Sequence, residues 1–173
     1  MEQRISKKVA ESRTIMSEMI MPNDTNPINN LMGGNLLRWM DIAAGICAGK
    51  HCEKYVVTVS ADYISFSQPI PVGDVITIEC VVTRAFGSSV EVFVEVFSSD
   101  IKGKNTRKCN DAYFTFVGLG EETKKPCQIP LVQPLNSEEQ KRYEEAMKRR
   151  QIRLWQAGKL SAADTEQLKS WIV

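Results

Sequence analysis

The sequence predicts an α+β protein, with a curved antiparallel sheet of about five strands wrapped around a central helix and a C-terminal helical extension. Residues 36–48 are apolar on almost every side, which is typical of a helix enclosed by other structure. The segments that follow are rich in β-branched and aromatic residues, and their short connections favour antiparallel pairing. With 173 residues, 43% of them hydrophobic, the chain can bury a core, and its length favours one domain with an appendage.

The first strand is predicted over residues 14–21 and ends at Pro22, because proline lacks a backbone donor. An Asp/Asn-rich turn then leads into the helix. The remaining strands are predicted at residues 55–66, 75–84, 90–97 and 107–119. In the two middle strands, strict alternation assigns residues to opposite faces of the sheet: Ile76, Ile78, Cys80 and Val82 share a face in one, and Val90, Val92, Val94 and Val96 oppose Glu91, Phe93, Glu95 and Phe97 in the other. Residues 86–88 connect these two strands as a hairpin.

The C-terminal part is predicted to be an appendage. Pro126, Pro130 and Pro134 mark an extended linker. Asn136 then caps a helix that begins with acids and ends with bases, as the helix dipole favours. A second short helix is predicted over Ser161–Trp171. The expected division is a domain over residues 1–125, followed by a linker and helical extension over residues 126–173.

Composition argues against several classes of function. The 22 basic and 21 acidic residues give a net charge of +1, which argues against binding nucleic acid or a membrane surface through bulk charge. The five cysteines form no CxxC pair and His51 is the single histidine, so neither a metal cluster nor a disulfide framework is supported. No run approaches the roughly 18 apolar residues needed to span a bilayer. We therefore predict a cytoplasmic protein, with Cys47 and Cys52 as reduced core or interface thiols.

The segment from Met21 to Asp41 has features of an active site. Gly33 and Gly34 let a ligand approach the backbone, and the first N–H groups of the helix are unpaired and partially positive, so a carbonyl or anionic oxygen would bind there. Asp41 follows Gly34 by about 10 Å along the helix axis, so it meets the same cleft only from a neighbouring subunit or through a long substrate. The alternative is an ordinary helix carboxylate that is solvated or paired with Arg38.

Five motifs occur in order within residues 14–119: PNDTN, the Gly pair entering the helix, WMDIAAGICA, FSQPIPVGD and RAFGSSVEVFVEV. Together they resemble the hotdog-fold acyl-CoA thioesterases. The resemblance implies hydrolysis of acyl-CoA to a free carboxylic acid and CoA without a metal or redox cofactor. It also implies sites between two hotdog protomers, in homodimers that commonly form hexamers as trimers of dimers. Two departures from the family pattern, Asn29-Asn30 in place of a glycine and the pair Asn26-Pro27, leave the preferred substrate length open.

The resemblance also implies roles for individual residues. Asp41 is expected to act as general base toward water or as the nucleophile, and Asn26 to orient water or hold the thioester oxygen. Gly33 and Gly34 are expected to supply backbone N–H groups as an oxyanion hole. The alternatives are an Asx-turn at Asn26 and tight backbone packing at the glycines. Asp24 is expected to be a structural turn residue.

A further set of residues is expected to meet the CoA phosphates through turn amides and charge-assisted bonds: Arg84, Gly87, Ser88, Ser89 and Arg107, with Lys102, Lys104 and Lys108 nearby. Ordinary solvated surface charge is the alternative reading of these side chains. Met32, Trp39 and Met40 are candidate walls of the acyl pocket, or plain core residues.

The main alternative function is a non-catalytic acyl-CoA binding or sensing protein on the same fold, since fold does not determine function. The presence of Asp41 argues against it. A hotdog dehydratase would be expected to use a histidine, whereas His51 is placed beyond the predicted helix as a cap that suits the helix dipole. At least a dimer is expected, because one protomer alone would leave an edge strand and half a site exposed.

Overall fold

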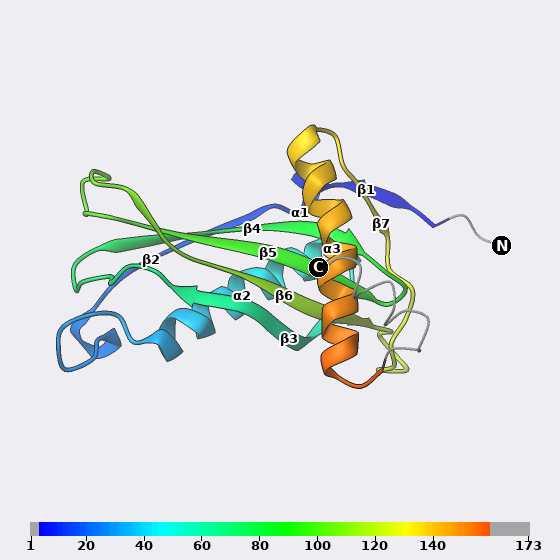
Figure 1. Ribbon diagram of the computed structural model, residues 1–173, viewed down its shortest axis with the longest axis horizontal. Coiled ribbons are helices and arrows are strands. Elements are labelled where there is room, and N and C mark those ends of the chain that lie inside the picture. The colour runs from blue at the N-terminus through cyan, green and yellow to red at the C-terminus, as the bar shows by residue number, and fades with distance from the viewer. Residues whose placement is uncertain (1–3, 160–173) are drawn as a thin grey trace. The chain divides into compact units, whose positions relative to one another are not determined.

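The computed structural model describes residues 4–159, and the chain divides into two compact units, Met1–Gln133 and Pro134–Val173. The first unit holds a five-stranded antiparallel sheet with strand order β2-β4-β5-β6-β3 (Figure 1). The strands are β2 (Thr14–Met19), β3 (Tyr55–Phe66), β4 (Val75–Ala85), β5 (Ser89–Ser99) and β6 (Arg107–Leu119). The predicted fold class and sheet are therefore confirmed.

Helix α2 (Gly33–Cys52) lies along one face of this sheet and contacts all five strands (Figure 1). Its apolar side chains form the core with the inward faces of the strands, and Met40, Ala43 and Ala44 are completely buried. The helix is longer at both ends than the apolar run 36–48. It starts at Gly33, because the Leu36 N–H already donates to the Met32 carbonyl at 3.1 Å, and it ends where Glu53 turns left-handed with φ 52°.

The strand predictions are confirmed closely. β3 and β6 have the predicted bounds, and β4 and β5 extend one or two residues further at their ends. The predicted inward face is buried at every position: Ile76, Ile78, Cys80, Val82, Val90, Val92, Val94 and Val96. On the opposite face, Glu91 is also fully buried and accepts a 2.7 Å hydrogen bond from the Thr83 hydroxyl, so the alternation pattern indicates the face but not the exposure.

Some short elements were not expected. β1 (Ser6–Lys8) pairs in parallel with β7 (Leu131–Gln133), so part of the predicted linker is a strand. Between them in sequence, α1 (Val9–Ser12) leads into β2. The first sheet strand ends at Met19, and a 3-10 turn over Pro22–Asp24 follows. The predicted domain boundary at residue 125 stays a prediction.

The second unit contains helix α3 (Ser137–Gln156). As predicted, the Asn136 side chain caps it by accepting from the Glu139 N–H at 2.9 Å, with acids in the first turn and a base in the last. The helix predicted over Ser161–Trp171 lies outside the described residues. No helix between residues 4 and 159 combines the length and apolarity needed to cross a membrane.

Candidate active site

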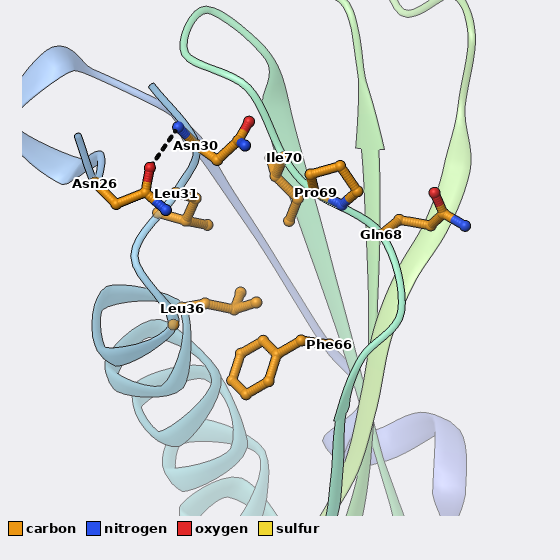
Figure 2. Close-up of a pocket in the computed structure, with 9 residues that line it drawn as sticks. Asn26, Asn30, Leu31, Leu36, Phe66, Gln68, Pro69 and Ile70 are labelled. Carbon is orange, nitrogen blue, oxygen red and sulfur yellow. Dashed lines mark hydrogen bonds between the residues drawn. The ribbon is translucent and has the colours of Figure 1, made fainter. Parts of the chain in front are cut away.

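The loop before α2 is held by Asn26. Its side-chain Oδ1 accepts from the N–H groups of Ile28 and Asn30, both at 3.1 Å, and its own N–H donates to the Asn30 carbonyl at 2.8 Å (Figure 2). Asn26 therefore forms the Asx-turn, and its Oδ1 is the acceptor in that turn. The Nδ2 group has no hydrogen-bond partner within residues 4–159. Asn26 can therefore offer a donor, rather than an acceptor, to a ligand.

Asp24 is a structural turn residue, as expected. Its Oδ2 accepts from the Met21 N–H at 3.0 Å. Its carbonyl accepts from the Met32 N–H at 2.9 Å and from Asn35 Nδ2 at 3.3 Å. These bonds tie the loop to the start of α2.

The two glycines play different parts at the helix start. Neither Gly33 N–H nor Gly34 N–H has an acceptor in the described part of the chain, and both lie at the partially positive end of α2. A Cβ on Gly33 would lie 3.1 Å from the Phe66 ring, so this glycine is also needed for packing. A Cβ on Gly34 would meet nothing within 4 Å. Gly34 is open to a ligand, and both expected uses of the pair are compatible with the geometry.

A cavity of about 440 Å³ lies beside these amides, and we call it the Gly33 cavity. Figure 2 shows its lining from the loop, the start of α2 and the segment after β3. Its lining residues are Asn26, Asn30, Leu31, Gly33, Leu36, Phe66, Gln68, Pro69 and Ile70. The walls are mostly apolar, with a few polar groups near the free amides, which is the usual composition of a small-molecule site.

Asp41 lies in the third turn of α2, away from the Gly33 cavity. It is half-buried, and its Oδ1 accepts a 2.7 Å hydrogen bond from the hydroxyl of Thr58 on β3. The alternative pairing with Arg38 does not occur between the described residues. Thr58 was missed in the sequence, because a threonine in a strand is ordinary and only the packing of β3 on α2 brings it to Asp41.

Exposed apolar side chains occur on the two elements that carry the Asp41–Thr58 pair. On α2, Ile42 and Ile46 are 40% and 46% exposed, and on β3, Val57 and Val59 are 44% and 55% exposed. β3 is also an edge strand, paired only with β6 within the described residues. Such a combination of an unpaired edge and apolar side chains is typical of a surface that another chain covers.

The expected CoA-binding residues fall into two groups. Gly87, Ser88 and Ser89 form the β4–β5 hairpin, with Arg84 close by. Arg107 lies about 30 Å away at the other end of β5, as the strand rise requires. One protomer therefore does not bring the two groups into one surface, and their role with CoA stays a prediction.

Arg107 is placed beside the Gly33 cavity. Its guanidinium pairs with Asp74 at 3.0 Å and donates to the carbonyl of Pro69, a cavity residue, at 3.3 Å. The group at the β4–β5 hairpin lies near Arg4, whose guanidinium donates to the carbonyls of Phe86 and Ile129. Each group is thus fixed by contacts within the fold.

The other predicted positions lie in the core or near it. His51 is inside the last turn of α2, not beyond the helix as expected, because the helix continues to Cys52. It is fully buried, its Nε2 lies 3.2 Å from the Pro130 carbonyl, and burial lowers its pKa. Trp39 and Met40 are core residues, whereas Met32 remains 38% exposed at the helix start. Cys47 and Cys52 are buried thiols, and burial raises the pKa of each to about 12.

No cluster of three or more metal-ligating side chains occurs among residues 4–159. The polar groups described above are the backbone amides at the start of α2, the Asn26 amide and the Asp41 carboxylate with its Thr58 partner.

Comparison with known proteins identifies the family. The sequence profile of the Thioesterase superfamily matches residues 28–103. A Bacillus subtilis protein named as an uncharacterized acyl-CoA thioester hydrolase, YkhA, is 36% identical over 129 residues, covering 75% of this chain and 74% of that protein. The relationship therefore extends through most of both chains.

Solved structures agree with this assignment. An apo-hexameric acyl-CoA thioesterase superimposes with a TM-score of 0.84 at 34% identity, covering 88% of this chain and 97% of the other. The acyl-CoA hydrolase of Staphylococcus aureus, in complex with butyryl-CoA, CoA and CoA disulfide, gives a TM-score of 0.82 at 30% identity, covering 96% and 98%. Variants of that hydrolase with one Asp, one Asn or one Thr replaced by alanine have also been solved. The chain belongs to the hotdog-fold acyl-CoA thioesterases and is a thioester hydrolase.

Proposed function

We propose that this protein hydrolyses acyl-CoA to a free carboxylic acid and CoA at a site shared between two protomers. Asn26, Gly33 and Gly34 come from one protomer, and Asp41 comes from the other. The observation that carries this proposal is the separation of the two halves on α2. The free amides lie at the helix start, whereas Asp41 lies about 12 Å further along the axis, on the part of α2 that carries the exposed Ile42 and Ile46.

The first half of the site suits the thioester carbonyl. Among residues 4–159, the Gly33 and Gly34 N–H groups and Asn26 Nδ2 are donors without partners, so they can receive an oxygen whose negative charge grows during the reaction. Fixed donors of this kind need no rearrangement as that charge develops. The apolar walls of the Gly33 cavity lie directly beside them.

The second half of the site, the Asp41 carboxylate, suits activation of water or direct attack on the thioester carbonyl carbon. Thr58 occupies Asp41 Oδ1, which leaves Oδ2 available to accept a proton from water or to attack the carbonyl carbon. In the first route, the water oxygen adds to the carbonyl carbon, the carbon–sulfur bond breaks, and the CoA thiolate takes up a proton. The reaction needs no metal or redox cofactor. Single turnover in ¹⁸O-labelled water tests the second route, since label in the Asp41 carboxylate requires an acyl-aspartyl intermediate.

Residue spacing supports this assignment. In the Staphylococcus aureus hydrolase, the Asn, Asp and Thr that were replaced stand at the same intervals along the chain as Asn26, Asp41 and Thr58 do here. Assembly is supported by the hexameric thioesterase of similar structure and by the exposed apolar residues around the edge strand β3. We infer a homodimer that further assembles as a trimer of dimers.

The first experiment measures release of the CoA thiol from acyl-CoAs of increasing chain length, for the wild type and Asp41→Ala. We expect the variant to fold normally and to lose about 10²–10⁴-fold in kcat, the usual contribution of a general base. Glu121→Ala, an exposed acid in the loop after β6, is the matched control and should retain activity. A fully active Asp41→Ala would remove Asp41 from the mechanism. Tight binding of acyl-CoA without turnover by the wild type would favour the sensing protein.

A complementation experiment tests the shared site. Asn26→Ala and Asp41→Ala are each expected to be inactive alone. In a mixed dimer, one of the two sites combines an intact Asn26 with an intact Asp41, so random mixing should restore about a quarter of wild-type activity. If both residues act within one protomer, mixing restores none.

A further inference from the structure

We propose that Phe66 sets the length of acyl chain that the enzyme accepts, with the Gly33 cavity holding the alkyl chain and the Phe66 ring forming its wall. This inference rests on the proposed function, because it needs the thioester carbonyl at the Gly33 and Gly34 amides. It assigns a specificity role to a residue outside the hydrolytic machinery.

Phe66 is the last residue of β3, and its ring extends to the first turn of α2. The ring atoms Cζ and Cε1 lie 3.1 and 3.2 Å from the position that a Gly33 Cβ would take. Figure 2 shows the ring turned toward Leu36 and the helix start. The side chain is 57% exposed, so it borders the cavity without being part of the packed core. A chain that enters beside the free amides therefore meets this ring.

The cavity favours an alkyl chain over the amide-containing arm of CoA. Leu31, Leu36, Pro69 and Ile70 supply apolar wall alongside Phe66. Two backbone donors of the wall are already engaged, because the Leu31 N–H donates to the Ile70 carbonyl at 2.8 Å and the Asn30 N–H donates to Asn26 Oδ1. An amide-containing ligand placed against Leu36, Phe66 and Pro69, away from the free amides, would find few partners, which is costly, whereas burial of methylene groups there is favourable.

The backbone on both sides of Phe66 is fixed. Asn110 on β6 donates through Nδ2 to the Ser65 carbonyl, and the Ser67 N–H donates to the Cys109 carbonyl at 3.1 Å. Asn110 is itself almost fully buried, so this anchor does not depend on solvent-exposed groups. The ring therefore cannot withdraw by a shift of the strand, and removing it should enlarge the cavity.

The test uses thioether analogues of acyl-CoA, in which a methylene replaces the thioester carbonyl, with alkyl chains from butyl to hexadecyl. Affinity is measured by calorimetry for the wild type, Phe66→Ala and Phe66→Trp. For the wild type, we expect affinity to rise by roughly fourfold for each methylene that enters the cavity and then to stop rising. We call the chain length at which affinity stops rising the break. Phe66→Ala should move the break to longer chains, and Phe66→Trp should move it to shorter ones. Tyr55→Ala, an exposed aromatic at the opposite end of β3, should leave the break unchanged.

The outcomes separate this inference from the proposed function. A wild type that hydrolyses acyl-CoA, with the same break in Phe66→Ala and Phe66→Trp, would overturn the role of Phe66 and leave the hydrolysis intact. An equal loss of affinity for every analogue and for CoA itself would also overturn it, since Phe66 would then contact the CoA portion. Shifted breaks without turnover by any thioester would support the alkyl site and refute the hydrolytic proposal.

Discussion

Replacing Thr58 with valine tests whether the hydrogen bond to Asp41 positions the carboxylate. Valine has nearly the same shape as threonine and suits a strand, so the change removes the hydroxyl and little else. In the proposed mechanism, Thr58 acts on the reaction only through Asp41, whose Oδ1 it holds at 2.7 Å. We therefore expect a loss in kcat with little change in KM.

The expected magnitude follows from the geometry. A hydrogen bond to a charged group contributes about 1.5–3 kcal/mol when well made. In the single protomer Thr58 is exposed and Asp41 half-buried, so we take the lower part of this range and expect about 1–2 kcal/mol. This corresponds to a roughly 5–30-fold decrease in kcat.

The assay compares steady-state hydrolysis by the wild type, Thr58→Val and Thr58→Ser, with the melting temperature of each. Serine keeps the hydroxyl, so Thr58→Ser should recover most of the lost activity. If Thr58→Val keeps full kcat while its fold is intact, the hydroxyl does not position Asp41. A decrease that appears only in KM would also contradict this reasoning, since it would indicate loss of substrate binding.

Two further predictions concern the fold. Burial lowers the pKa of His51 below its ordinary value of 6.5, so below about pH 6.5 the unfolded chain binds a proton that the folded chain does not. The free energy of unfolding should therefore be at its full value above pH 6.5 and fall by up to about 1.4 kcal/mol per unit as the pH decreases, and His51→Gln should flatten this dependence in urea denaturation. Gly118→Ala should lower the free energy of unfolding by about 1–3 kcal/mol, because its Cβ would lie 2.7 Å from Ile129 Cγ2. Gly49→Ala, whose Cβ would meet only a carbonyl at 3.8 Å, should not destabilise, and equal melting temperatures for the two variants would refute the packing argument.

The strands could be predicted because the residues that specify each strand are neighbours in the sequence. Alternation along β4 and β5 requires only the strand period, and the bounds of β3 and β6 follow from residue type and from turn residues. The start of α2 was harder, because two glycines disfavour a helix and the structure nevertheless begins there. The β1–β7 pair joins two segments that lie more than a hundred residues apart in the sequence. Each strand has only three residues, which is too short for an alternation pattern to predict a strand or its partner.

The site shows the same division between local and long-range information. Asn26 and Asp41 stand within recognisable motifs, and the Asx-turn could be expected from residue type alone. Thr58 and Phe66 have no such signal. Both become important only when β3 pairs with β6 and packs beside α2, which places one against Asp41 and the other against Gly33.

The geometry of a single helix suits the proposal of a site shared by two protomers. Free N–H groups at a helix start point along the axis, whereas a side chain points away from it. Asp41 follows Gly33 by about 12 Å along α2 and by roughly 80° around it, so within one protomer the two meet the same ligand only through a long substrate. A second copy related by two-fold symmetry can supply the carboxylate, and the same symmetry completes a second site. In the proposed enzyme, the surface that excludes water from the edge of β3 is thus also the surface that assembles the catalytic groups, and dissociation into protomers should abolish turnover even though each protomer keeps its fold.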